Sequence, residues 1–360
     1  MLNFGQMGRV SFLGTSNALT IDNNPYTLVS NIKTLASDIA TNPSGFYALA
    51  NNYDASADGT YFSSPIPTTF TGTLEGLGNA ISKFSLSNPA EGDAALFVRI
   101  DTAGTVAHFH LLNIELVTRF VGAGLAVISN GTLTDDSASG EFSGLSGVSR
   151  GVSVAGLVNV NGGNITGCHA NVQIIAGTVG ALAGGLVAQN EALIEDSWAT
   201  GSVEVQKGTL RNASRAGGLV GINDWSISNS YSSAKVRAKA TAWLGGLVGL
   251  NDGFPNTATI SDSYASGIVT GSLPDHIGGL IGWDSSASGN VTDTYWDTTT
   301  SGITNLSQGA GSPSNDPGIT GLTGTQLQSG LPAGLDSSIW SEKSTINGGL
   351  PYLLAAPPPH

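Results

Sequence analysis

Apolar residues recur along the middle of the chain in short clusters rather than in long runs. The clusters are "GLVNVN" at 156–161, "GLVAQN" at 185–190, "GLVGIN" at 218–223, "GLVGLN" at 246–251 and "GLIGWD" at 279–284. Their starts are separated by 29, 33, 28 and 33 residues. Such a period indicates a stacked array, in which one repeat cannot bury its apolar face alone.

A second motif follows each apolar cluster, for example "LIEDSWATGSVEV" from residue 193 and "SISNSYSSAKVRA" from residue 226. These segments are rich in Val, Ile and Thr and are separated by Asn, Asp and Gly, which is typical of strands joined by tight turns. A repeat of about thirty residues holds roughly three strands of five residues and their turns. We therefore predict an all-β protein, a single right-handed parallel β-helix with about 30 residues per coil.

Alternation along the second motif predicts which side chains face the interior. The small and apolar positions are Ser197, Ala199, Gly201, Val203 and Val205, and they should fill the coil. The intervening polar positions and the aromatic residue that precedes them should face outward, and Glu204 should pair with Arg237 in the next coil. The Gly-Leu-Val strand is apolar on both faces, so its orientation stays open.

The two ends of the chain differ from the repeats. Residues 30–41 carry apolar residues at helical spacing (Ile32, Leu35, Ala36 and Ile39), and a second short helix is expected within 324–331. We expect a cap over 1–65, repeats over 66–304, and a second cap with a Pro-rich tail over 305–360. All three form one continuous solenoid, whose caps cover open strand edges.

The charge balance excludes some classes of partner. The chain has 13 basic and 26 acidic residues, a net charge of −13, which opposes nucleic-acid binding. No run reaches the roughly 18 apolar residues of a membrane-spanning helix. The single cysteine, Cys168, excludes a disulfide within the chain and is expected to fill the core.

Several segments together resemble a known group of bacterial proteins. "GGLVGIN…ISNSYSS" and "GGLVGLN…ISDSYASG" are similar to the GLUG repeat of large exoproteins. "TFTGTLEGLGNAISKFSLS" at 69–87 and "YTLVSNIKTLASDIATNPSGFYALANNYDAS" at 26–56 resemble the segments that precede GLUG arrays in filamentous-haemagglutinin-like proteins. The endings "TYWDTTTSG" and "INGGLPYLLA" also fit, so the resemblance covers nearly the whole chain.

This resemblance implies a passenger segment of a two-partner-secreted adhesin, displayed as a β-helical fibre. The full-length protein would then need an outer-membrane secretion partner. The first residues lack the form of a signal peptide and no secretion domain is evident, so we expect a fragment of a longer secreted or cell-surface protein. Its partners would be host or bacterial cell-surface glycans or receptors.

The first candidate site is a row of outward aromatic side chains. Trp198, Tyr231 and Tyr264 are 33 residues apart, and Tyr295 has the equivalent place in the next repeat. Such rings can stack on the sugars of an extended polysaccharide. The alternative is that they stack on one another and only stabilise adjacent coils.

The second candidate site is a row of side-chain oxygens two residues before each aromatic, namely Asp196, Asn229, Asp262 and Asp293. Stacked carboxylates can bind Ca²⁺. However, Asn and Asp at the junction of a strand and a turn commonly hydrogen-bond to their own backbone, and that is the reading we favour. We therefore expect no metal site and no cofactor.

Carboxylates for catalysis are not grouped in the sequence. Candidates are Asp135, Asp136, Glu141, and Glu195 with Asp196, but Asp135 and Asp136 should point to opposite faces of a strand. His108 and His110 share a face in "HFH" without a recognisable third zinc ligand.

We therefore predict a non-enzymatic adhesin module whose long face binds cell surfaces, mainly glycans, by many weak contacts. One alternative is a polysaccharide-acting enzyme, which requires a groove with acidic residues from adjacent coils. The other is a structural spacer, whose outward aromatics should be covered by loops.

Overall fold

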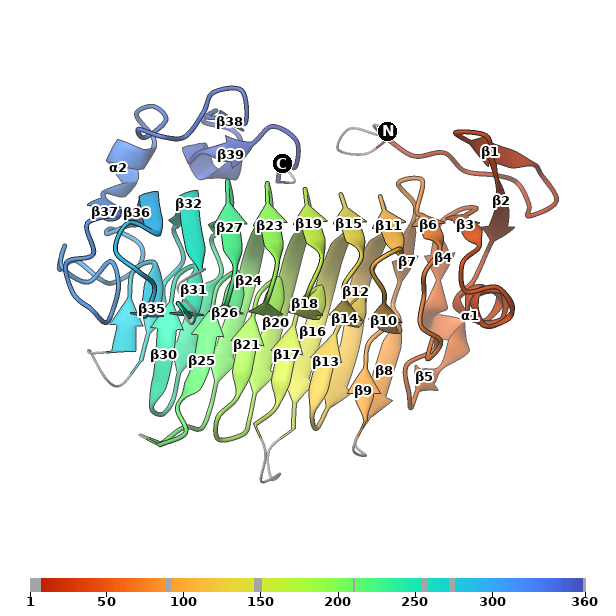
Figure 1. Cartoon of the computed structure of the whole chain (residues 1–360), viewed down its shortest axis with the longest axis horizontal. Helices are drawn as coiled ribbons and strands as arrows, with labels where there is room; N and C mark the ends of the chain where they lie inside the picture. Colours follow the sequence, from red (N-terminus) through yellow and green to blue (C-terminus); the bar gives the residue numbers. More distant parts are fainter. Residues whose placement is uncertain are drawn as a thin grey trace.

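The computed structural model describes residues 8–88, 92–145, 151–209, 211–253, 258–271 and 276–358. It shows a parallel β-solenoid of about 8 turns with roughly 30 residues per coil, so the predicted fold class is confirmed. The coils lie side by side along the long axis of the molecule (Figure 1). No helix in these residue ranges is long and apolar enough to cross a membrane.

Each coil passes through three parallel sheets in turn, and the coil of residues 182–205 illustrates the path. It enters sheet 1 through β21 (Leu182–Gly184), bends into sheet 2 through β22 (Val187–Asn190), and then runs through β23 (Leu193–Glu195) and β24 (Trp198–Val205) of sheet 3. Successive coils pair in register, as Ile194 does with Ile227 and Val203 with Val236.

Sheets 1 and 2 have seven strands each. Besides β21, sheet 1 contains β9 (Asp93–Ala94), β13 (Val121–Ala123), β17 (Ser153–Ala155), β25 (Ser214–Gly217), β30 (Ala242–Gly245) and β34 (Ile277–Gly278). Besides β22, sheet 2 contains β10 (Phe97–Ile100), β14 (Ala126–Ser129), β18 (Val158–Asn161), β26 (Val220–Asn223), β31 (Val248–Asn251) and β35 (Ile281–Asp284).

Sheet 3 holds the remaining strands of the coils. Its short strands are β6 (Thr73–Glu75), β11 (Thr105–Ala107), β15 (Thr132–Thr134), β19 (Asn164–Thr166), β23 and β27 (Ser226–Ser228). After a turn of two residues, or of four after β6, the chain continues in sheet 3. The strands that follow are β7 (Ala80–Ser82), β8 (Ser85–Asn88), β12 (His110–Thr118), β16 (Ser137–Gly144), β20 (His169–Ala176), β24, β28 (Tyr231–Ser232) and β29 (Lys235–Ala238). The last coils add β32 (Thr259–Ala265), β33 (Val269–Thr270), β36 (Val291–Asp297) and β37 (Ile319–Leu322).

The interior follows the predicted alternation. Ala199, Val203 and Val205 are buried, while the intervening Ser202 and Glu204 are partly exposed. Cys168 is fully buried as expected, since it stands in the same column as Ser197. The core is therefore a stack of Val, Ile, Leu and Ala side chains that continues from coil to coil.

The Gly-Leu-Val motif forms the sharp bend between sheets 1 and 2, which resolves its orientation. Leu186 and Val187 both point into the core and are fully buried. The glycine of the motif is needed for space, because a Cβ on Gly218 would come within 2.1 Å of the carbonyl oxygen of Gly246 in the next coil. The motif is apolar at successive positions because the bend turns both its Leu and its Val side chain into the core.

The last residue of each Gly-Leu-Val motif forms a buried ladder of side-chain amides. Asn161 donates to Asn190, Asn190 to Asn223, and Asn223 to Asn251, each with an Nδ2–Oδ1 distance of 2.8 Å. Asn251 then donates to Asp284 Oδ1 at 3.0 Å, which ends the ladder with a carboxylate. Each amide is satisfied by its neighbours, so the ladder fixes the register of adjacent coils.

The amino-terminal end is closed by the predicted helix, α1 (Ile32–Thr41). Asn31 caps it by accepting a hydrogen bond from Thr34 N at 2.8 Å, and Ile32, Leu35 and Ile39 are buried against the first coils. Around it lie β1 (Leu19–Ile21), β2 (Asn24–Val29), β3 (Phe46–Leu49), β4 (Tyr53–Asp54), the 3₁₀ helix Ala55–Asp58 and β5 (Thr60–Tyr61).

The carboxy-terminal segment does not act only as an end cap. After β37 the chain forms α2 (Gly324–Leu327), within the expected range, and then the antiparallel pair β38 (Trp340–Ser341) and β39 (Tyr352–Leu353). This segment turns back and lies over the last coils, near β36, β32 and β27 (Figure 1). We name residues 323–358 the return segment.

Candidate functional site

The predicted aromatic residues form a stacked row on the outside of sheet 3. Ring centroids are 5.9 Å apart between Trp198 and Tyr231 and 5.2 Å apart between Tyr231 and Tyr264, with nearly parallel planes. His169 extends the row, because its ring stacks on Trp198 at 4.5 Å. Tyr295 follows in register with Tyr264.

The return segment covers this aromatic row. Trp198 Nε1 donates to the carbonyl oxygen of Ala356 at 2.7 Å, and the hydroxyl of Tyr264 donates to that of Pro351 at 2.6 Å. Trp340 packs on the rings of Tyr231 and Tyr264. The predicted set Trp198, Tyr231, Tyr264 and Tyr295 is between 0 and 7 % exposed. The geometry therefore offers no ring face to a sugar, and it fits the structural alternative.

The predicted row of oxygen ligands forms the turns of the solenoid. Asp196, Asn229, Asp262 and Asp293 have φ between 44° and 50°, the left-handed conformation that Asn and Asp tolerate better than other residues with a Cβ. Each stands just before β24, β28, the aromatic part of β32, or that of β36. Among the described residues, no group of three or more Asp, Glu, His or Cys side chains is arranged to hold a metal ion.

His108 and His110 are two residues apart, as expected for one face of a strand, but they contact different partners. His108 Nδ1 lies 2.9 Å from Glu75 Oε1, and its Nε2 lies 3.4 Å from Asp135 Oδ2. Burial acts to lower the pKa of His108, but the hydrogen bonds with Asp135 and Glu75 outweigh it and raise the pKa to about 10. His108 is thus a buried cation between two carboxylates, a structural ion pair.

Asp136 points into the solenoid while Asp135 does not, as predicted. Asp136 is fully buried, accepts a hydrogen bond from Phe109 N at 2.9 Å, and burial raises its pKa well above the usual range. Cys168 holds the equivalent interior position in the next coil, and burial also raises the pKa of its thiol. Glu195 bonds to Thr166 Oγ1 at 3.0 Å in the preceding coil. Asp136, Cys168 and Glu195 are not among the residues that line the two hollows described below.

Glu141, by contrast, lies in a groove on the outer face of sheet 3. One hollow of about 450 Å³ is lined by Asn113, Glu115, Ser139, Glu141, Asn171 and Gln173, together with Ile114 and Gly140. A second hollow of about 410 Å³ begins at Gln173 and continues to Lys235, Arg237 and Ile268. Because Gln173 belongs to both, the two hollows form one path across the coils.

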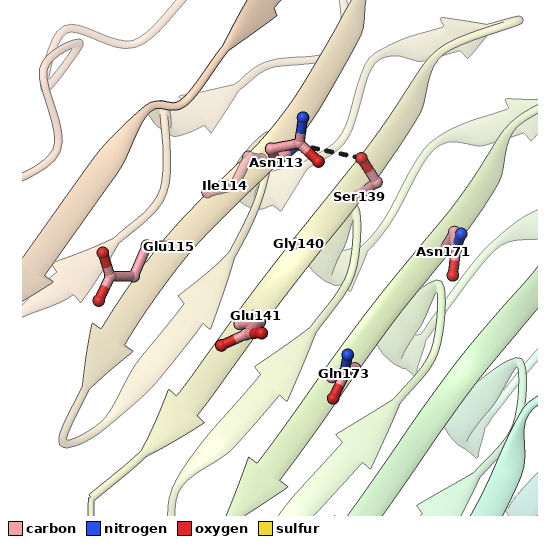
Figure 2. A pocket seen from close by; sticks show the side chains of 8 residues that line it. All are labelled: Asn113, Ile114, Glu115, Ser139, Gly140, Glu141, Asn171 and Gln173. Atoms are coloured by element: carbon pink, nitrogen blue, oxygen red, sulfur yellow. Dashed lines mark hydrogen bonds between the residues drawn. The ribbon is translucent and has the colours of Figure 1, made fainter. Parts of the chain in front are cut away.

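The floor of the groove is a row of side chains from neighbouring strands. Strand register places Glu115, Glu141, Gln173, Ser202 and Lys235 opposite one another in that order. Figure 2 shows the first three side chains on successive strands. With strands about 4.8 Å apart, the row extends roughly 19 Å along the solenoid. It is acidic at one end, neutral in the middle and basic at the other.

A kink in the long strands accompanies the groove. The register of β12 against β16 shifts between Leu111 and Ile114, and Asn113 has a φ of 55°. Gly140 fills the crowded position opposite, because a Cβ there would come within 2.0 Å of Ile114 O. A bulge of this kind bends its strand and redirects the neighbouring side chains. Ser139 fixes the bulge by accepting a hydrogen bond from Asn113 N (Figure 2).

The basic end of the groove combines charge with apolar surface. Ile175 and Ile268 are 44 and 45 % exposed there, beside Lys235 and Arg237. Glu204 lies 3.9 Å from Arg237 and 2.6 Å from Lys239 Nζ, so the predicted pair of Glu204 with Arg237 is present but weak. The basic end therefore keeps cationic side chains in contact with solvent.

The comparisons with known proteins identify the repeat. The sequence profile of the GLUG motif matches residues 212–237 and 244–270, the two repeats in which the pattern is clearest. The search of curated proteins gave no match. The prediction of GLUG repeats is confirmed, whereas a filamentous-haemagglutinin-like adhesin is not.

A solved structure shares the overall fold, and a second matches part of the chain. A Bacteroides ovatus protein described as a candidate immunoglobulin A1 protease is similar over 93% of this chain and 94% of its own, with a TM-score of 0.56 and 15% identity. A second chain, described as an IgA1 protease, is similar over 73% of this chain and 19% of its own, with a TM-score of 0.46 and 24% identity.

These similarities correct one prediction. We expected a protein without enzymatic activity, because the sequence resembles adhesins and its carboxylates are not grouped in a repeated cluster. That expectation was wrong, because the solved chain that is similar over 93% of this one is described as a candidate protease. At these levels of identity the likeness establishes the fold, and the chemistry must be argued from the side chains of this chain.

Proposed function

We propose that this chain is the ligand-binding segment of a secreted or cell-surface protein, and that it holds an extended glycan in the groove on sheet 3. The observation that supports it is the polar row from Glu115 through Gln173 to Lys235. Amide, hydroxyl and carboxylate groups pair with sugar hydroxyls, and their spacing on successive coils suits a polymer lying along the solenoid.

Display on a rigid solenoid fits this proposal. Each coil adds a few hydrogen bonds, so affinity depends on how many coils the glycan contacts. The polymer would come from a host or neighbouring bacterial cell. The adhesin-type parent, with an outer-membrane secretion partner, remains part of the proposal.

The test is a glycan-array screen of the purified chain beside the double variant Asn171→Ala/Gln173→Ala. Both side chains are exposed in the groove, so the variant should fold normally and lose most of its array signal. Asn164→Ala is the matched control, since this exposed Asn belongs to the same coil but not to the groove. Equal signals from the double variant and the control would reject the groove.

The acidic end of the groove favours a second candidate, cleavage of the bound glycan. Glu115 and Glu141 are in register on adjacent strands, which is the convergence of acidic residues from neighbouring coils that we required of an enzyme. Strand spacing of about 4.8 Å brings two carboxylates close to the separation of about 5–9.5 Å used by glycosidases.

In this candidate one carboxyl group protonates the glycosidic oxygen and the other activates water or attacks the sugar. The assay measures release of reducing ends from any glycan that the array identifies. Glu115→Gln and Glu141→Gln should each abolish release and leave binding within a few-fold of wild type. Release that persists in both variants excludes this pair.

A further inference from the structure

A cluster of aromatic and cationic side chains lies where sheets 1 and 2 meet, on strands other than those of the groove. Arg215 on β25 is in register with Trp243 on β30, and its Cζ lies 4.6 Å over the indole ring. Trp283 on β35 reaches the same place from sheet 2, with 4.9 Å between the two ring centroids. All three side chains are partly exposed.

In the described part of the chain, no direct ion pair neutralises the charge of Arg215. Its guanidinium makes no hydrogen bond or ion pair there, and its Nε is buried without an acceptor. Burial lowers the pKa of Arg215, and the nearby Asp252 acts in the opposite direction. Contact with Trp243 offsets only part of the desolvation. A half-buried cation without a direct ion pair or hydrogen bond, in a chain of net charge −13, therefore calls for an explanation.

The two indole groups present further donors at the same place. Within the described residue ranges, neither Trp243 Nε1 nor Trp283 Nε1 donates to a protein acceptor, unlike the buried Trp198 and Trp296. Guanidinium and indole N–H groups donate only, so the matching ligand group is an acceptor with negative charge. A carboxylate fits, because its two oxygens accept parallel hydrogen bonds from an arginine.

We propose that Arg215, Trp243 and Trp283 form a second site, which binds the carboxylate of an acidic saccharide. The flat apolar surface of the indoles suits the C–H groups of a sugar ring next to that carboxylate. The choice of a saccharide rests on the proposed function, whereas the carboxylate follows from the three side chains themselves.

The experiment is a calorimetric titration of the full chain with trigalacturonate and with its methyl ester, which keeps the rings and removes the charge. Trigalacturonate should bind, and the ester should bind at least ten-fold more weakly. Arg215→Gln should weaken trigalacturonate binding at least ten-fold, and Arg215→Lys should recover only part of it because lysine lacks the planar fork. Trp283→Phe keeps a ring without the N–H donor and should weaken binding several-fold.

The matched control is Arg237→Gln, the same change at the basic end of the groove. Normal binding by this control with loss in Arg215→Gln supports the second site. Loss in Arg237→Gln with normal binding in Arg215→Gln places the acid in the groove, which overturns the second site and leaves the proposed function standing. Equal binding of acid and ester, or no binding at all, also overturns it. If Arg215→Gln lowers the melting temperature, Trp283→Phe decides the result.

Discussion

Trp198 Nε1 donates a hydrogen bond to the carbonyl oxygen of Ala356, 158 residues later in the chain, at 2.7 Å. This bond joins the outer face of sheet 3 to the return segment. Around it lies an apolar cluster separate from the core inside the coils, and it includes Leu327, Leu335 and Leu353 from the return segment. The solenoid thus has a second core, on its outside, which stabilises the last coils.

We expect Trp198→Ala to destabilise the protein strongly. The change leaves a cavity beneath the return segment and an unpaired carbonyl at Ala356, and substitutions of this size in a core cost about 3–5 kcal/mol. The measurement is chemical unfolding, with proteolysis to detect release of the return segment. Trp225→Ala is the control, since Trp225 is 50 % exposed and should change stability little. Equal stabilities of the two variants would contradict a structural role for the aromatic row.

The asparagine ladder should be as sensitive as the apolar core. Asn223→Ala leaves the amide of Asn190 without its acceptor and the side-chain oxygen of Asn251 without its donor. An unsatisfied buried polar group costs about 1–3 kcal/mol, so a loss of several kcal/mol in the free energy of unfolding is expected. Asn164→Ala, at an exposed strand position, should cost less than 1 kcal/mol. A small effect at both positions would show that the ladder does not fix the register.

The carboxylate that ends this ladder predicts a pH dependence. Burial and then the hydrogen bond with Asp284 raise the pKa of Asp316 from 3.8 to about 6. Between these values the folded state binds more protons than the unfolded state, so this contribution to stability is present at low pH and is lost as the pH rises through 6. Asp316→Asn should remove the effect, whereas Asp284→Asn should reduce it, because burial would still raise the pKa of Asp316.

The measurement is the melting temperature of the wild type and of Asp316→Asn at pH 5 and at pH 7.5. The wild type should lose more stability over this interval than the variant. Asp284→Asn should give an intermediate change, because Asp316 stays buried, and it also extends the amide ladder by one residue. Identical changes with pH in all three proteins would contradict a raised pKa of Asp316 in the folded state.

The repeating part of this structure could be predicted from the sequence. Alternation and period determine which residues of β24 and β29 face inward, because each coil solves the same packing problem with the same residue types. Asn190, Asn223 and Asn251, which form the amide ladder, also recur at a fixed place, the last position of each Gly-Leu-Val motif. The pattern alone does not predict the ladder, because an asparagine beside a turn is ordinarily a turn residue.

The features that vary from coil to coil could not be predicted from the repeat pattern. The groove depends on the bulge at Asn113 and on the glycine opposite, and neither recurs in every repeat. Alternation placed Trp198 outward correctly, but outward is not exposed when a distant segment such as 323–358 folds over the position. Contacts of such long sequence separation leave no local pattern, so the burial of the aromatic row emerges only in the folded structure.

A matched pair of substitutions on β29 tests the alternation itself. Val236 is 1 % exposed inside the coil, whereas its neighbour Lys235 points outward into the groove. Val236→Asp buries a charge without a partner and should prevent folding or remove most of the stability. Lys235→Asp introduces the same side chain one residue earlier and should leave the melting temperature within a few degrees of wild type. A result in which both variants unfold, or both fold normally, would contradict the register of β29 against β24.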